Sequence, residues 1–434
     1  MKVAFYTLGC KVNQYETQAL ERLFTARGHT LVPFEGDADV YIINTCTVTA
    51  MSDKKSRQTV RQARKRAPGA LVAVCGCYPQ THPDDMDGLS VDLVSGSGDR
   101  LGFVERVEQA WKERRPVRTL DDAMRRRDFE ILPAGGLEGR TRAFLKVEDG
   151  CVNFCAYCII PYARGPVRSL PLAAAASQAR QLSEEGYREL VLTGIEISSW
   201  GRDLRDGSGL IDLVEAVCAA APGCRVRLGS LEPRTIAEEF CARAARLDNL
   251  CPHFHLSMQL GCDATLKRMG RKYDTARFTE SLDRLRRHFT LPAVTTDMIV
   301  GFPGETEEEF AQSLEFIRRC GFSAMHIFPY SKRPGTPAAS MPGQVSRAVK
   351  EERAHQAGEA AARMEQDYLE RWLGQTVPVL FEEQKDGLWW GHTARYSRVG
   401  AASGENLHNR LREVQITEVK SGWLLGELLN LEKR

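Results

Sequence analysis

The sequence predicts an α/β protein made of three successive parts. Apolar, β-like runs alternate with polar amphipathic stretches over residues 1–115, and the alternation starts again over 141–373. From residue 374 onward the apolar runs become short and are separated by the turn pairs Asp386-Gly387 and Ser421-Gly422. The first pattern is typical of parallel sheets covered by helices, and the second of antiparallel barrels. We therefore predict a doubly wound parallel α/β domain, a partial (β/α)6 barrel and a small antiparallel β-barrel.

The first domain is predicted to span residues 1–115. Its strands are expected at 3–8, 40–43, 71–74 and 92–94, where most residues are apolar. The segments 14–26 and 53–65 are polar and amphipathic, as the crossover helices of a parallel sheet should be. Residues 116–140 mix acids and arginines with prolines and glycines and lack apolar periodicity, so we predict a linker there.

The second domain, residues 141–373, contains six further β-like runs. They lie at 143–147, 189–193, 225–229, 254–258, 294–300 and 324–328, and helical segments separate them. Six successive βα units favour a parallel sheet that curls toward a barrel and carries its active-site loops at the carboxyl ends of the strands. A polar helix over 346–373 is expected to close this domain. The third domain, 374–434, is the predicted small barrel, with runs at 377–381, 388–390, 414–419 and 423–425.

Composition narrows the class of protein. The 434 residues are 43% hydrophobic and 27% charged, which is ordinary for globular domains and excludes wholesale disorder or a fibrous rod. The formal net charge is only +2, so a polyanionic partner would have to be met by local basic patches. Neither a signal peptide nor a membrane span is visible, which predicts a cytoplasmic protein with no membrane contact. In a reducing compartment, specially spaced members of the thirteen cysteines are expected to be metal ligands or reactive thiols.

The strongest motif is a C-x3-C-x2-C run formed by Cys151, Cys155 and Cys158. It directly follows the first strand of the second domain, and such a run rarely arises by chance. The same spacing also suits one buried face of a helix, but Gly150 and Pro161 argue against a long helix here. A zinc site is a second alternative. Three thiolates in one loop suit a cubane iron-sulfur cluster whose fourth iron lacks a cysteine and can bind substrate.

A second set of cysteines lies in the first domain. Cys10, Cys46 and Cys77 each come just after a predicted strand. The carboxyl ends of parallel strands share one edge of a sheet, so these distant residues are expected to converge there. Cys75 competes with Cys77 for the third position, and we favour Cys77, with Cys75 facing the core. The alternative is that all of them are ordinary buried cysteines.

Both cysteine sets carry a resemblance to a known family. The C-x3-C-x2-C run, with Tyr157 before its last cysteine, is similar to that of the radical S-adenosylmethionine superfamily. The motifs LGCKVNQYE at 8–16, NTCTV at 44–48 and GCYPQ at 76–80 resemble those of the methylthiotransferase subgroup. Further motifs that resemble this subgroup lie at 230–233, 259–263, 297–306 and 328–336. The resemblance implies a radical-SAM barrel, S-adenosyl-L-methionine and two [4Fe-4S] clusters. The cluster on Cys151, Cys155 and Cys158 would generate the radical, and Cys10, Cys46 and Cys77 would hold an auxiliary one.

The resemblance also implies a substrate. The word around Cys10 is similar to that of the branch that methylthiolates C2 of N6-threonylcarbamoyladenosine at position 37 of tRNA. The terminal barrel matches the position of the TRAM-like RNA-binding module of these enzymes, and a reductant such as flavodoxin or ferredoxin is expected. The alternatives are isopentenyladenosine in tRNA, an aspartate of a ribosomal protein or, without catalysis, a zinc-bearing RNA-binding protein.

Further cofactor-binding residues are expected around the barrel strands. Tyr157 would shield the bound nucleoside, and Glu196 would accept a hydrogen bond from the ammonium group of the cofactor. The full predicted set is Tyr157, Thr193, Gly194, Glu196, Ser230, Glu232 and Gly301. Gly301 is included because a residue without a side chain lets a ligand approach the backbone. For the polar members, helix capping or simple exposure is the alternative.

RNA contacts are predicted in two places. Residues 51–70 hold seven basic residues and one acidic residue, a local net charge of +6, and the expected contacts are Lys54, Lys55, Arg57, Arg61 and Arg64. The terminal domain has no net charge, but Trp390, Arg395 and Arg398 could stack on or clamp RNA. The target would be the tRNA anticodon loop, because an unpaired base is easily moved into a pocket. A solvated helix face and buried barrel tryptophans are the alternatives.

Overall fold

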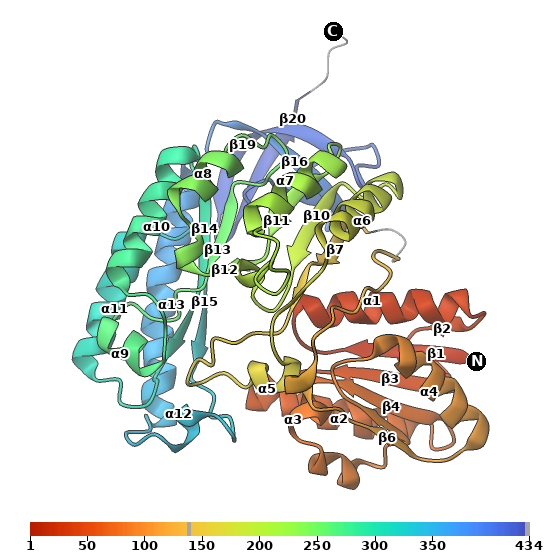
Figure 1. Ribbon diagram of the computed structural model, residues 1–434. Coiled ribbons are helices and arrows are strands. Elements are labelled where there is room, and N and C mark those ends of the chain that lie inside the picture. The colour runs from red at the N-terminus through yellow and green to blue at the C-terminus, as the bar shows by residue number, and fades with distance from the viewer. Residues whose placement is uncertain (137–139, 430–434) are drawn as a thin grey trace.

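The structure is a computed structural model that describes residues 1–136 and 140–429. The three predicted parts follow one another along the chain (Figure 1), and the predicted fold class is confirmed. The terminal barrel lies at the top of the central domain in this view, and the amino-terminal domain lies below. The predicted linker, 116–140, and terminal domain, 374–434, include residues 137–139 and 430–434, which lie outside the described residues. The bounds of the four predicted segments stay predictions.

The amino-terminal domain is a parallel sheet in the order β2-β1-β3-β4-β5-β6. Its strands are β1 (Lys2–Thr7), β2 (Thr30–Val32), β3 (Val40–Thr45), β4 (Leu71–Gly76), β5 (Leu93–Ser95) and β6 (Val117–Thr119). The helices are α1 (Lys11–Ala26), α2 (Ala50–Arg66), the short α3 (Cys77–Thr81) and α4 (Arg100–Glu113). Separate apolar clusters on the two faces bury β3 and β4 completely, which explains their unbroken apolar runs. The prediction missed the edge strands β2 and β6, and β6 belongs to the sheet although it lies in the predicted linker.

The central domain is a partial barrel of two parallel sheets, in the orders β11-β10-β7 and β12-β13-β14-β15. A bridge between Val226 and Leu250 joins them. The strands are β7 (Arg142–Lys146), β10 (Glu189–Thr193), β11 (Arg225–Leu228), β12 (Ser230–Leu231), β13 (His253–Leu256), β14 (Ala293–Val300) and β15 (Ala324–Pro329). In the described chain β7 and β15 do not pair, and α1 packs against β7 beside this opening. The amino-terminal domain therefore borders the open side of the barrel.

The helices of the central domain lie mostly on the outside of this partial barrel. They are α5 (Ile160–Arg164), α6 (Leu172–Glu184), α7 (Leu210–Ala220), α8 (Glu238–Ala244), α9 (Asp263–Arg268), α10 (Thr275–His288), α11 (Glu307–Cys320), α12 (Pro337–Ser340) and α13 (Arg347–Glu370). The short β8 (Glu148–Asp149) and β9 (Arg168–Ser169) flank α5 and pair with each other. The predicted closing helix is α13, which packs along β15. Among the described residues, no helix combines the length and the apolar character needed to cross a bilayer.

The terminal domain is a closed barrel in the order β16-β17-β18-β20-β19. Its strands are β16 (Thr376–Lys385), β17 (Leu388–Thr393), β18 (Arg398–Ala401), β19 (Leu411–Lys420) and β20 (Trp423–Leu428). The expectation of a purely antiparallel barrel is wrong in one pairing, because β18 and β20 run parallel. β18 was also missed, since its four residues, Arg-Val-Gly-Ala, form no long apolar run.

Candidate functional site: two cysteine sets around an interdomain cavity

The structure brings Cys10, Cys46 and Cys77 together at one edge of the amino-terminal sheet. Cys10 caps α1 after β1, Cys46 follows β3, and Cys77 begins α3 after β4. A Cβ atom added to Gly9 would lie only 2.7 Å from the Cβ of Cys46 and 3.0 Å from its Sγ, so the first two loops are in close contact. Cys75 instead lies fully buried in the sheet core. The geometry therefore favours Cys77 over Cys75 as the third member.

Asn13 fastens the loops that carry these cysteines. Its Nδ2 donates to the carbonyl oxygens of Leu8 at 2.8 Å and Thr45 at 2.9 Å, which belong to two different cysteine loops. Its Oδ1 accepts from Arg164 Nη2 at 2.6 Å. Arg164 in turn donates from Nε to the Sγ of Cys77 at 3.3 Å. One asparagine thus links the auxiliary cysteines to a guanidinium group from the central domain.

Cys151, Cys155 and Cys158 lie in the loop between β8 and α5. The loop is not helical, since α5 begins only at Ile160, so the alternative of a buried helix face is wrong. Two of the sulfurs already accept hydrogen bonds: the Asn153 N–H lies 3.5 Å from Cys151 Sγ, and Arg271 Nη1 lies 3.1 Å from Cys155 Sγ. These donors are suited to stabilising thiolates rather than neutral thiols.

Both sets fit iron-sulfur clusters better than a single ion. Within residues 1–136 and 140–429, no three or more His, Cys, Asp or Glu side chains are grouped tightly enough to hold one metal ion. In a cluster each thiolate binds its own iron, so the sulfurs need not converge on one point. Burial raises the pKa of Cys46 to about 12 and, aided by the neighbouring Cys155, that of Cys158 to about 12. Binding of iron would stabilise these buried sulfurs as thiolates.

Apart from Tyr157, which lies in the loop of Cys155 and Cys158, the predicted cofactor-binding residues gather beyond β10 and β11, with one exception. Thr193 ends β10, and Gly194 has no room for a Cβ, which would lie 2.7 Å from Glu148 Oε2. Glu196 accepts hydrogen bonds locally from Ser198 N–H at 3.1 Å and from the Ser199 hydroxyl, so part of its capacity serves as the expected cap. Ser230 is exposed on β12, and the buried Glu232 pairs with Arg234 at 2.8 Å.

Gly301 is the exception. An added Cβ would lie 2.4 Å from Cγ of Lys350 on α13, and its N–H donates to the Glu305 carboxylate. The close approach at Gly301 is therefore made by the protein's own Lys350, and a ligand contact at Gly301 stays a prediction.

Glu148 was not predicted from the sequence. It is fully buried, its Oε2 accepts from the Glu196 N–H at 2.7 Å, and its Oε1 has no partner among the described residues. Burial, opposed by that hydrogen bond and reinforced by the nearby carboxylates, raises the pKa of Glu148 well above its ordinary value. An unsatisfied buried oxygen beside the predicted cofactor residues fits a ligand that brings a hydrogen-bond donor.

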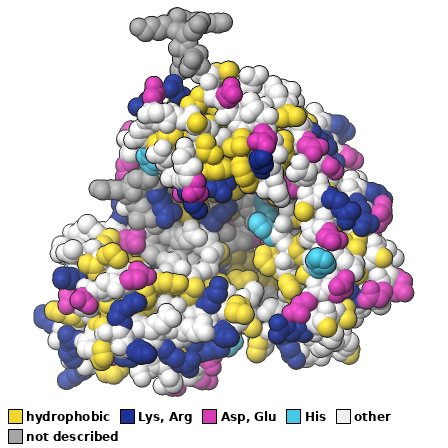
Figure 2. Space-filling view, turned by 180° about the vertical axis from the view of Figure 1, so that it is seen from behind, with side chains coloured by type: hydrophobic (Ala, Val, Ile, Leu, Met, Phe, Trp, Pro, Cys, Tyr) yellow, Lys and Arg dark blue, Asp and Glu magenta, His cyan; other side chains and the backbone are white. Residues whose placement is uncertain are grey.

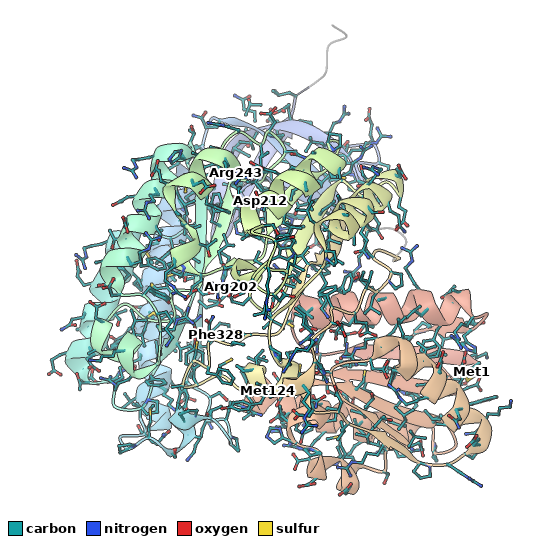
Figure 3. All side chains as sticks on the ribbon, in the orientation of Figure 1. Met1, Met124, Arg202, Asp212, Arg243 and Phe328 are labelled. Atoms are coloured by element: carbon teal, nitrogen blue, oxygen red, sulfur yellow. The ribbon has the colours of Figure 1, made fainter. Side chains whose placement is uncertain are left out.

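A cavity of about 250 Å³ lies between the two cysteine sets. Its walls come from the loop after Cys46, the loop of Cys158, the barrel strand β14 and the end of β15; the lining includes Val48, Thr49, Tyr157, Cys158, Asp297 and Phe328. Phe328 lies at the boundary between the amino-terminal and central domains (Figure 3), and 46% of it is exposed. From behind, the surface is hollowed between these two domains (Figure 2). Tyr157 thus lies where a bound nucleoside could be shielded.

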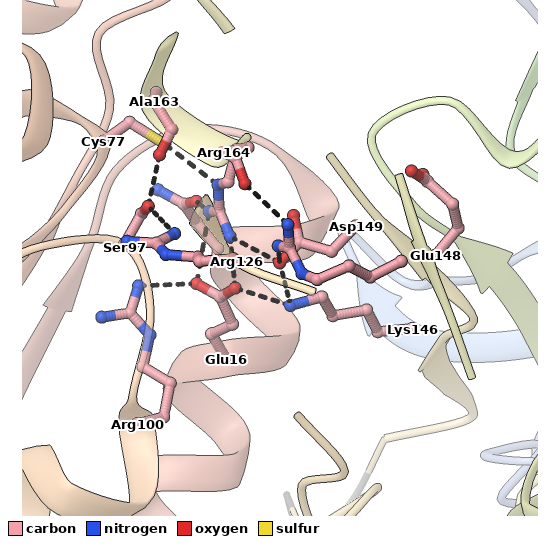
Figure 4. Close-up of polar contacts among 12 residues, drawn as sticks. Glu16, Cys77, Ser97, Arg100, Arg126, Lys146, Glu148, Asp149, Ala163 and Arg164 are labelled. Carbon is pink, nitrogen blue, oxygen red and sulfur yellow. Dashed lines mark hydrogen bonds and ion pairs between the residues drawn. The ribbon is translucent and has the colours of Figure 1, made fainter. Parts of the chain in front are cut away.

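A buried ion network joins the two domains beside the auxiliary cysteines (Figure 4). Glu16 of α1 accepts from Arg100 at 2.8 Å, from Lys146 at 2.9 Å and from Arg164. Asp149 contacts Lys146 at 2.8 Å and Arg168 at 3.2 Å. Burial alone would raise the pKa of Glu16, but the charges of Arg100, Arg164 and Lys146 hold it well below its ordinary value. The network fixes both cysteine loops relative to each other.

Some of the RNA-binding residues predicted on α2 are exposed, and others form contacts within the amino-terminal domain. Lys54, Lys55 and Arg61 are exposed on α2. Arg64 donates to the Ser90 carbonyl at 3.0 Å and pairs with Asp92, and Arg57 bonds to the Tyr78 hydroxyl. The acid that reduces the charge of this segment, Asp53, is buried against Arg333 at 2.6 Å. The guanidinium group of Arg64 is therefore engaged within the amino-terminal domain, and its contact with RNA stays a prediction.

The terminal barrel uses its predicted RNA contacts internally. Trp390 is buried, and its Nε1 donates to the Lys385 carbonyl at 3.2 Å. Arg398 lies over the Trp390 ring at 4.2 Å from the centroid. Arg395 donates to the carbonyls of Leu291 at 2.8 Å and Thr290 at 2.7 Å, which docks the barrel on the central domain. Trp390 and Arg395 therefore serve the packing of the barrel, and their contact with RNA stays a prediction.

Comparison with known proteins agrees with the motifs. Residues 2–96 match Uncharacterized protein family UPF0004, and residues 145–317 match the Radical SAM superfamily. The threonylcarbamoyladenosine tRNA methylthiotransferase MtaB of Bacillus subtilis (strain 168) is 40% identical over 431 residues, 98% of this chain and 95% of that protein. The chain belongs to the threonylcarbamoyladenosine branch of the radical S-adenosylmethionine methylthiotransferases. The predicted family is thereby confirmed.

More distant relatives place this methylthiotransferase in a wider group. The tRNA-2-methylthio-N(6)-dimethylallyladenosine synthase of Moorella thermoacetica is 34% identical, covering 98% of this chain and 97% of that protein. The radical S-adenosylmethionine methyltransferase TsrM from Kitasatospora setae has the same fold, with a TM-score of 0.56 at 13% identity over 90% of this chain and 80% of that one. The architecture is therefore shared more widely than the methylthiotransferase motifs.

Several residues of the methylthiotransferase site could not be found from the sequence. Arg164, Arg271 and Lys146 contact cysteines or the buried network, but each is an ordinary basic residue in a mixed segment. Only Glu16 had a signal, because it ends the word that contains Cys10.

Proposed function

We propose that the protein is a tRNA-modifying enzyme that methylthiolates C2 of N6-threonylcarbamoyladenosine at position 37, giving 2-methylthio-N6-threonylcarbamoyladenosine. The observation that carries the proposal is the cavity between the two cysteine sets, which the loops after Cys46 and around Cys158 both line. A base placed there would lie between the two chemical centres that such a reaction needs. The named functions of the relatives from Bacillus subtilis and Aquifex aeolicus (strain VF5), the latter 36% identical, support the substrate.

In this proposal Cys151, Cys155 and Cys158 hold the radical-generating [4Fe-4S] cluster, and Cys10, Cys46 and Cys77 hold the auxiliary one. When bound, these clusters supply the reductive cleavage of S-adenosyl-L-methionine and a site for the sulfur that is transferred. Arg271 and Arg164 donate hydrogen bonds to Cys155 and Cys77 and so offset the negative charge of the ligands.

The chain's own residues then orient the cofactor and exclude water. Glu196 and the unpaired Oε1 of Glu148 could accept hydrogen bonds from the amino group of S-adenosyl-L-methionine. Because the pKa of Glu148 is raised, its protonated carboxyl group could instead donate a hydrogen bond to the carboxylate of the cofactor. Tyr157 covers one side of the cavity, and Phe328 with Val48 presents apolar surface to a base. Thr193, Gly194, Ser230 and Glu232 stay candidates for the remaining contacts.

The partner is proposed to be the anticodon loop of tRNA, met by Lys54, Lys55 and Arg61 on α2, while Arg57 and Arg398 have both internal contacts and some exposure. A small protein reductant such as flavodoxin or ferredoxin would supply electrons. We propose the cytoplasm as the compartment, because both tRNA and such reductants are found there.

The function is tested with anaerobically reconstituted protein. Iron and labile sulfide should reach about eight atoms of each per chain, four for each cluster. The protein should then methylthiolate RNA that carries threonylcarbamoyladenosine, as measured by nucleoside mass spectrometry. Zinc without labile sulfide would favour the non-enzymatic RNA-binding alternative. Modification of isopentenyladenosine, or of a ribosomal peptide, in place of threonylcarbamoyladenosine would reassign the substrate.

A further inference from the structure

A second, larger cavity opens on the unpaired side of the central barrel. Its volume is about 760 Å³, and residues of all three domains line it. Lys11 and Gln14 come from α1, Arg142 and Arg227 from the barrel strands, and Glu382 and Tyr396 from the terminal barrel. Lys11 immediately follows Cys10, so the cavity adjoins the auxiliary cysteine set.

Most cations of this cavity already have partners. Arg227 donates to both carboxylate oxygens of Glu189, at 2.8 and 2.9 Å. Arg142 donates to Glu382 at 2.7 Å and to the Tyr396 hydroxyl at 2.8 Å. Lys11 differs from these two arginines, because its ammonium group makes no hydrogen bond or ion pair within residues 1–136 and 140–429, although its side chain is exposed to the cavity. Arg140 also lines this cavity and has no such contact within those residues.

The acids near Lys11 cannot neutralise it. Burial and the positive charges of Arg227 and Arg142 lower the pKa of Lys11, and the carboxylates Glu189 and Asp297 oppose this. Glu382 and Glu383 line the same cavity, where Glu382 pairs with Arg142 and Glu383 lies 3.7 Å from Arg398. Glu189 is bound by Arg227 and by Arg225, the latter at 2.8 Å, and Asp297 faces His255 at 3.4 Å. Lys11 is therefore a cation that pairs with no carboxylate of the described chain, and it lies in a cavity large enough for a substituent of a nucleoside.

Asp297 connects this site to the proposed reaction centre. It lines the cavity between the two cysteine sets, and its negative charge acts on the Lys11 ammonium. A nucleoside whose base lies between the cysteine sets can therefore direct a substituent toward Lys11. The substituent that fits an uncommitted ammonium group is an anionic one.

We propose that Lys11 binds the carboxylate of the threonylcarbamoyl group and so selects this nucleoside over the uncharged isopentenyladenosine. This inference rests on the proposed function and assigns the specificity of the same site to one side chain. A phosphate of the RNA backbone is the other anion that could reach Lys11, and the experiment separates the two.

The experiment measures binding to the reconstituted holoenzyme by fluorescence anisotropy. The probes are two anticodon stem-loop RNAs, one with threonylcarbamoyladenosine and one with its methyl ester, which lacks the negative charge but keeps every phosphate. The wild-type protein should bind the acid about 10-fold to 100-fold more tightly than the ester, the usual effect of removing one partner of a charge-assisted hydrogen bond. Lys11→Met should reduce this ratio to about one, and Lys11→Arg should keep it well above one.

Lys112→Met is the matched control, since it makes the same change at an exposed lysine on α4. It should leave the ratio at the wild-type value. A ratio of affinities near one in the wild-type protein, or an unchanged ratio in Lys11→Met, overturns the proposal. An equal loss of affinity for the acid and the ester in Lys11→Met also overturns it, because such a loss indicates that Lys11 binds a backbone phosphate or supports the structure.

Turnover by the wild-type holoenzyme tests the proposed function separately. If that protein does not methylthiolate the acid RNA, the function itself is wrong. If it does so with equal affinity for acid and ester, only the role of Lys11 is wrong.

Discussion

Replacing Glu16 with glutamine is expected to weaken the docking of the amino-terminal domain on the barrel. The side chain is fully buried and faces Arg100, Lys146 and Arg164, so glutamine keeps the volume but removes the charge that these cations share. Asp149 still compensates Lys146 and Arg164, whereas Arg100 has no other acid in the network. Leaving a buried charge unpaired costs about 3–5 kcal/mol of unfolding free energy. Because Asp149 still pairs with two of the three cations, we expect a loss at the lower end of this range, about 3 kcal/mol.

The loss is measured by urea unfolding at neutral pH, followed by tryptophan fluorescence and circular dichroism. Glu21→Gln is the matched control on the same helix. The Oε2 atom of Glu21 is buried and accepts no hydrogen bond from the residues that the structure describes, and burial raises the pKa of Glu21 to about 7. Removing this charge should therefore leave the free energy of unfolding unchanged or increase it. Equal effects of the two substitutions, or a loss below about 1 kcal/mol for Glu16→Gln, would refute the reasoning.

Two further predictions follow from the contacts described above. Gly9→Ala should remove about four of about eight irons per chain, because the new Cβ would collide with Cys46. Gly28→Ala is the control: Gly28 also has a positive φ, but nothing lies within 4 Å of an added Cβ, so this variant should keep its iron. Equal iron contents in the two variants would contradict the prediction. Burial raises the pKa of Glu189, but Arg227 and Arg225 outweigh it and hold the folded value at about 2 against an ordinary 4.5. Stability from Glu189 should therefore be complete above about pH 5 and fall by about 3 kcal/mol as the pH drops to about 2, an acid dependence that Glu189→Gln should lack in urea unfolding.

The sequence predicted those parts of the fold that depend on long apolar runs. β3 and β4 are buried on both faces and were located to within two residues, because burial on both sides requires a continuous apolar strand. β2 and β6 have three residues each and lie at the edges of the sheet, where partial exposure removes that requirement. β6 was consequently assigned to a linker.

The same contrast applies to the site. The cysteines could be proposed as cluster ligands because the chemistry of such clusters constrains both the type and the spacing of their ligands. The internal contacts of Arg395 and Arg64 could not be predicted because decisive partners lie far away in the sequence: carbonyls of residues 290 and 291 hold Arg395, and Asp92 pairs with Arg64. A basic or aromatic side chain looks the same in a sequence whether it meets RNA or its own fold.

Arg164 also has a consequence for the order of assembly. It follows all three auxiliary cysteines in the chain and reaches Cys77 only after the first barrel strand and the loop of the second cysteine set have been made. The amino-terminal domain, synthesised first, would emerge without the cation that lies against Cys77 and without Lys146, the second cation on Glu16. The auxiliary centre is thus incomplete in the domain that contains its ligands, and loading it would have to wait for the following domain, so neither half can be expected to mature alone.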